Sequence, residues 1–112
     1  MQEVSLKNIK KTGDKLDLEI YYLPLVIVFT YIDKHNYWVM DFYTSSNSEE
    51  PFLSGVKCKC NEDLLLYFLG ILPGVPLASL QFISNSNKQY IEGDDMANGD
   101  TTLCILLKEE IV

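Results

Sequence analysis

The 112-residue sequence has few residues that could carry catalytic or metal chemistry. It contains one histidine, His35, and three cysteines, Cys58, Cys60 and Cys104. The cysteine count is odd, and the segment Met1–Lys7 lacks the apolar stretch of a signal peptide. We therefore expect reduced thiols, as in a cytoplasm, rather than a disulfide framework.

The spacing of these residues does not predict a reactive centre. His35 lies in a turn-forming segment, with no nucleophile or second base beside it in the sequence. Cys58 and Cys60 would lie about 6.5–7 Å apart on one face of a strand. Structural zinc ligands normally have two to four residues between them and a second pair elsewhere. These cysteines are thus expected to be small buried hydrophobic residues.

The carboxylates also lack a catalytic pattern. They occur as the adjacent pairs Glu49-Glu50, Asp94-Asp95 and Glu109-Glu110. Adjacent side chains diverge in a strand and stay solvated in a loop, so burial would not raise their pKa values. The acidic segment Glu92–Asp100 does not match a calcium-binding loop. We predict no catalytic residues, no metal, no cofactor and no enzymatic activity.

A basic surface is missing as well. Nine Lys plus Arg residues stand against sixteen Asp plus Glu, which gives a formal net charge of −7. A field of that sign repels phosphate backbones and anionic lipid surfaces, so we expect neither nucleic-acid nor membrane binding.

No apolar run is long enough to span a bilayer. The segment Leu64–Asn87 carries no charge, but Pro73–Pro76 interrupts it, and Leu64–Leu72 is far short of the roughly 20 residues that a spanning helix needs. Either the domain core hides this segment, or it forms a surface for a partner protein. For the second case, the candidate interface residues are Tyr67, Phe68, Leu69, Ile71 and Leu72.

Period-two alternation is the dominant pattern in the first half of the chain. Every second residue between Lys15 and Tyr22 is apolar, which predicts a strand with one buried face. The β-branched and aromatic segment Leu25–Ile32 suits a central strand that is covered on both sides. Leu23-Pro24 is expected to form a bend between the two strands.

A hairpin is predicted next. Asp33–Asn36 has the composition of a turn, and Tyr37–Tyr43 would be the return strand. Trp38, Met40 and Phe42 fall on one face of it. Core packing is the expected role of Trp38, and exposure as an interface or sugar platform is the alternative.

The rest of the chain alternates between strands and polar loops. Asn61–Asp63 resembles a helix start, so residues 64–70 form a short helix or else a short strand or turn. The further strand candidates are Pro51–Cys60, Leu77–Ser84, Thr101–Lys108 and, more weakly, Val4–Lys11. Residues 1–112 are thus predicted to form one all-β domain. It would be a small antiparallel sandwich or barrel of six to seven strands, with at most one short helix near residues 62–70.

The order of these segments resembles the cyanophage baseplate plug family, small β proteins of contractile phage tails. The similarity covers about residues 14–108. It rests on an apolar strand, an aromatic-Trp-x-Met-Asp strand, a strand with a central glycine, a Leu-Leu pair and an acidic turn. In this sequence these are Leu25–Tyr31, Tyr37–Asp41, Phe52–Lys57, Leu64-Leu65 and Asp94-Asp95. Family members tend to carry a glycine shortly before the Leu-Leu pair, where this chain has Asn61-Glu62, and the acidic turn here is longer.

The resemblance implies a structural part of a phage or prophage tail baseplate, made in the host cytoplasm and assembled into the virion. Its partners would be other baseplate proteins, such as hub or tube-end subunits, with self-association as a further expectation. The alternative is a cytoplasmic β-sandwich module that binds a protein or a carbohydrate. A small enzyme without a recognisable motif is a third hypothesis.

Overall fold

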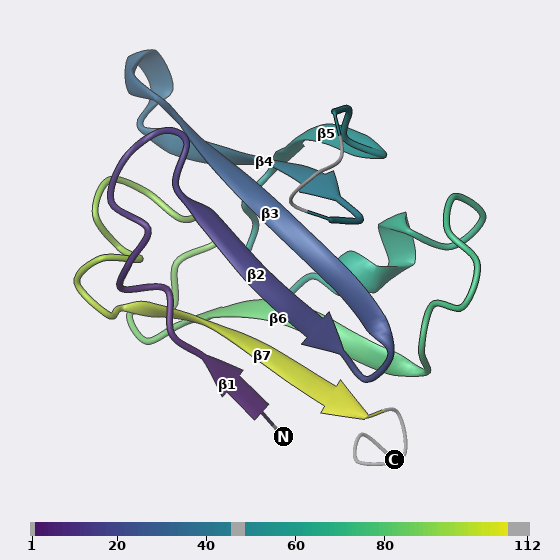
Figure 1. Cartoon of the computed structure of the whole chain (residues 1–112). Helices are drawn as coiled ribbons and strands as arrows, with labels where there is room; N and C mark the ends of the chain where they lie inside the picture. The colour runs from purple at the N-terminus through teal and green to yellow at the C-terminus, as the bar shows by residue number, and fades with distance from the viewer. Residues whose placement is uncertain (1, 46–48, 108–112) are drawn as a thin grey trace.

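The computed structural model describes residues 2–45 and 49–107, which fold into a β-sandwich (Figure 1). Within these residues, seven strands form two antiparallel sheets, and helical structure is limited to two short 3-10 turns. The predicted all-β class is therefore confirmed. The strands are β1 (Gln2–Val4), β2 (Lys15–Ile20), β3 (Leu23–Ile32), β4 (Tyr37–Tyr43), β5 (Leu53–Lys57), β6 (Ala78–Ser84) and β7 (Thr101–Leu107). The 3-10 turns are η1 (Asp33–His35) and η2 (Leu64–Tyr67).

The larger sheet has the strand order β2-β3-β4-β5. Its first hairpin corrects one prediction, because the chain turns at Tyr21-Tyr22 and Pro24 lies within β3 opposite Glu19. Proline is tolerated there because the missing N–H would point toward β4, whose pairing with β3 ends at Val26. The second hairpin confirms the predicted turn, with Asn36 in the left-handed conformation at φ 54°.

The smaller sheet has the order β1-β7-β6. Strand β1 ends at Val4, so the predicted strand Val4–Lys11 is wrong over most of its length. Leu6 and Ile9 are three residues apart and both buried, and the Ile9 N–H donates to the Leu6 carbonyl. That spacing belongs to a turn, since strand neighbours that share a face are two residues apart.

The core lies between the two sheets. In β4 the side chains alternate strictly, with Trp38, Met40 and Phe42 buried, as their period predicts. Strand β3 is central, as expected, but Val28 on its outer face is only half-buried, so that face is not fully covered.

The short segment after β5 connects the two sheets. The Cys58 N–H donates to the Trp38 carbonyl of β4 at 3.0 Å, and the Asn61 N–H donates to the Phe82 carbonyl of β6 at 2.8 Å. Between these bonds, Lys59 pairs with Tyr90 in an isolated antiparallel bridge. Main-chain hydrogen bonds therefore tie the two layers together, in addition to side-chain packing.

Candidate functional site

The candidate interface begins at η2, where Asp63 organises the backbone. Its Oδ1 accepts hydrogen bonds from the Leu65 N–H and from the Leu80 N–H of β6, each at 3.1 Å. This carboxylate is the N-cap of η2 and also satisfies a backbone donor at the edge of β6. Of the alternatives for residues 64–70, a short helix or else a short strand or turn, the structure has a 3-10 turn over Leu64–Tyr67, which is held directly against the smaller sheet.

Phe68 is the candidate residue whose position differs most from the prediction. It is fully buried and makes edge-to-face ring contacts with Phe42 at 5.0 Å and Phe52 at 5.2 Å between centroids. Aromatic rings favour this geometry, and the cluster anchors η2 to the larger sheet. Phe68 is therefore a core residue and is removed from the interface candidates, in line with the alternative that the core hides part of this segment. Leu72 is half-buried against the same core.

The other three candidates, Tyr67, Leu69 and Ile71, are exposed. Two residues outside the predicted set are at least as accessible, Leu66 at 60% and Leu77 at 81%. In Figure 1 the loop that runs from η2 to β6 projects from the side of the sandwich.

Exposed side chains from both ends of this segment surround one small apolar hollow of about 80 Å³. We call this surface the 66–77 patch. It comprises Leu66, Leu69, Val75, Pro76 and Leu77, with the buried residues Leu65 and Ala78 behind them. Neighbouring exposed leucines on a folded domain are typical of a protein–protein contact surface.

Sequence features could have identified Leu66 and Leu77, the two exposed residues outside the predicted set. Leu66 belongs to the same leucine run as Leu64 and Leu65, and Leu77 follows the Pro73–Pro76 interruption, immediately before β6. The backbone turns at Gly70 and Gly74, where φ is +84° and +73°. These turns bring the two ends of the segment together, which a linear pattern does not indicate.

The three thiols are shielded from solvent. Cys58, Cys60 and Cys104 are free and buried. Burial raises the pKa of the Cys58 thiol well above its ordinary value, and burial with the nearby Asp95 and Asp100 raises the pKa of Cys60 to about 11. The thiolate form needed for nucleophilic attack is therefore disfavoured at neutral pH.

His35 lies on the surface of the η1 turn and stacks on Tyr37, with 5.8 Å between ring centroids. Across residues 2–45 and 49–107, no three His, Cys, Asp or Glu side chains gather closely enough to hold a metal ion. The reactive residue types of the sequence are thus not brought together in the described part of the chain.

Trp38 is buried, and its indole N–H is hydrogen-bonded. Its Nε1–H donates to the Gly93 carbonyl at 2.8 Å, while the Gly93 N–H donates to the Asn36 side chain at 3.0 Å. These bonds lock the β3–β4 turn against the acidic turn near residue 94. Because Trp38 is only 3% exposed, it cannot serve as a sugar-binding platform, which weakens the carbohydrate hypothesis.

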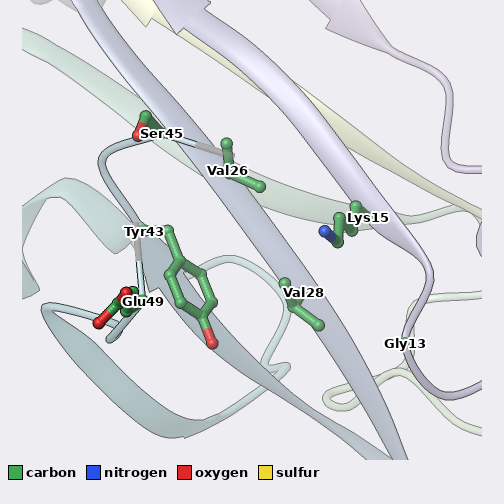
Figure 2. A pocket seen from close by; sticks show the side chains of 7 residues that line it. All are labelled: Gly13, Lys15, Val26, Val28, Tyr43, Ser45 and Glu49. Carbon is green, nitrogen blue, oxygen red and sulfur yellow. The ribbon is translucent and has the colours of Figure 1, made fainter. Parts of the chain in front are cut away.

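A second hollow, of about 330 Å³, lies on the outer face of the larger sheet (Figure 2). Val26 and Val28 of β3 line it, between Lys15 of β2 and Tyr43 of β4. Its lining includes Glu49 but neither a cysteine nor a histidine, so it does not unite the candidate nucleophiles of the sequence.

Among the described residues, no helix is both long enough and apolar enough to cross a membrane.

No curated protein shows significant similarity to the chain. The family described as cyanophage baseplate Pam3 plug gp18 matches residues 1–108, in agreement with the resemblance carried by the strand order and motifs. With this match over nearly its whole length and an all-β fold of two antiparallel sheets, the chain belongs to the cyanophage baseplate plug family.

Proposed function

We propose that this chain is a non-enzymatic plug of a contractile phage or prophage tail baseplate, and that it packs against the central hub through the 66–77 patch. Membership of a baseplate plug family supports a virion tail component that associates with other baseplate proteins. Its action would be mechanical: it would occlude or brace the end of the tube and release it when the baseplate rearranges.

The observation that carries the contact is the exposure of Leu66, Leu69 and Leu77 around one hollow. Covering a leucine side chain with apolar surface is worth about 1.5–3 kcal/mol. A hub subunit with an apolar projection would therefore gain affinity from this surface without any charged partner. The net charge of −7 adds selectivity, because subunits with acidic surfaces are repelled.

Binding to the purified hub protein of the same phage tests this proposal. Leu69→Ser and Leu77→Ser should each raise the Kd for the hub at least about tenfold, as measured by titration calorimetry. Tyr22→Ser is the matched control, since Tyr22 is 90% exposed but lies in the β2–β3 turn, outside the patch. It should leave the Kd unchanged.

Folding of each variant is checked by circular dichroism. Folded patch variants that bind the hub with wild-type affinity would overturn the contact. Absence of the chain from purified virions, examined by mass spectrometry, would overturn the baseplate assignment itself.

A further inference from the structure

The two sheets have four edges, and three of them are closed to further strands. Strand β1 is only three residues long. Strand β5 has a register shift against β4, with Gly55 at φ +73° and its N–H bonded to the Asp41 carboxylate. Short strands and bulges are the usual means by which proteins block edge pairing.

The edge of β6 is closed by its own chain. The Phe82 carbonyl accepts the Asn61 N–H, and the Leu80 N–H donates to Asp63. Backbone groups that would receive another strand are therefore already bonded.

Strand β2 differs from these three edges. It is regular over Lys15–Ile20, and β3 alone pairs with it among the described residues. Because Ile20 and Leu23 flank a two-residue turn, the even-numbered residues of β2 direct their N–H and C=O groups toward β3. The Phe29 N–H of β3 also donates to an even-numbered residue, the carbonyl of Asp14, just before β2. The backbone groups of Lys15, Asp17 and Glu19 therefore point away from the sheet.

The side chains along β2 specify how another strand could add. Lys15, Asp17 and Glu19 lie exposed on the outer face, while Leu16 and Leu18 face the core but remain half-exposed because no strand flanks them. In an antiparallel pair of two copies, Lys15 can lie opposite Asp17 of the second copy and Asp17 opposite its Lys15. The next register in one direction would pair Lys15 with Glu19 but place two Asp17 side chains opposite each other, which is destabilising. The next register in the other direction would place two Lys15 side chains opposite each other. Of these three registers, only the first has opposite-charge pairs without a like-charge contact.

We propose that two copies of this chain associate through their β2 edges in this register, which joins the two larger sheets into one continuous sheet. The arrangement has two-fold symmetry, so the Lys15–Asp17 ion pair occurs twice. It would satisfy the outward N–H and C=O groups of Lys15 and Asp17 in both copies and cover Leu16 of each. This inference rests on the sheet edge alone and does not depend on the contact with the hub.

Charge exchange between the two copies gives a sharp test by sedimentation equilibrium. The wild-type chain should form a concentration-dependent dimer, which is weak because few residues pair. Lys15→Asp and Asp17→Lys should each be monomeric under the same conditions, since each puts like charges opposite each other. An equimolar mixture of the two variants should dimerise again, because both pairs become complementary.

Leu77→Ser separates this interface from the 66–77 patch and should dimerise like the wild type. A wild-type chain that stays monomeric up to about millimolar concentration would overturn the inference. Dimers that persist in both charge variants, or a mixture that remains monomeric while each variant is folded, would also overturn it.

Discussion

Phe68 and Leu69 are adjacent in the sequence but lie in opposite environments. Phe68 is enclosed by the rings of Phe42 and Phe52, whereas Leu69 is 60% exposed beside the hollow of the 66–77 patch. Stability and association should therefore respond to different residues of one short segment.

Phe68→Ala is expected to lower the free energy of unfolding by about 3–5 kcal/mol, because it removes a buried ring and leaves a cavity. Leu69→Ala should change that free energy by no more than about 0.5 kcal/mol, as is usual for exposed positions. Urea denaturation of both variants measures the difference. Equal losses would contradict the placement of these two side chains.

Burial of single residues was predictable wherever the backbone repeats regularly. The alternation in β4 identified Trp38, Met40 and Phe42 as core residues, because neighbouring strand side chains point to opposite faces. The segment 64–77 has no such period, since a 3-10 turn is followed by turns at Gly70 and Gly74. That is why Phe68 was named among the interface candidates and Leu66 and Leu77 were not.

At the scale of elements, Asp63 connects η2 to β6. Its carboxylate caps the turn and occupies the edge of the strand through Leu80. The local sequence predicted a helix start at Asn61–Asp63, with the acids in the first turn, whereas the structure has Asp63 itself as the cap. The hydrogen bond to Leu80 joins residues that are 17 positions apart in the sequence, so a local sequence pattern could not predict it.

Asp63→Ala should lower the free energy of unfolding by about 1–3 kcal/mol, since two backbone donors lose their acceptor. Amide hydrogen exchange at Leu65 and Leu80 should accelerate together. Asp63→Asn keeps an oxygen acceptor and is the matched control, with a smaller loss. If the Leu80 amide exchanges at the wild-type rate in the alanine variant, the connection between turn and sheet is not as described.

At the scale of the whole molecule, the acidic composition includes carboxylates with defined structural roles. The Asp14 carboxylate accepts the N–H groups of Lys10 and Lys11, and these bonds hold its pKa below the ordinary value of 3.8. The Ser86 and Ser84 hydroxyls donate to Asp100 and lower its pKa in the same way. Both groups therefore stabilise the folded state only when they are ionised.

A lowered pKa in the folded state gives a contribution that is present above about pH 3.8 and is lost as the pH falls through the folded value. The free energy of unfolding should decline on acidification below that pH. The decline should be shallower in the double variant Asp14→Asn, Asp100→Asn, measured by urea titrations across the acidic range. Identical pH profiles for the two proteins would refute the role of these carboxylates.

The class of fold followed from residue patterns, whereas the biological setting did not. Alternating strands and turn-rich links are sufficient to predict an all-β domain, but they are shared by proteins of many functions. It was the order of motifs along the chain that indicated the family, because neither composition nor spacing contains a motif that is diagnostic of one function.

The segment from Cys58 to Asn61 has a mechanical consequence. Its backbone is bonded to Trp38 in one layer and to Phe82 in the other. A load applied to either sheet is thus carried to the opposite one by the polypeptide itself, and the sheets cannot slide past each other without breaking these bonds. Such a molecule would respond to an applied force as one block and not as two separable layers.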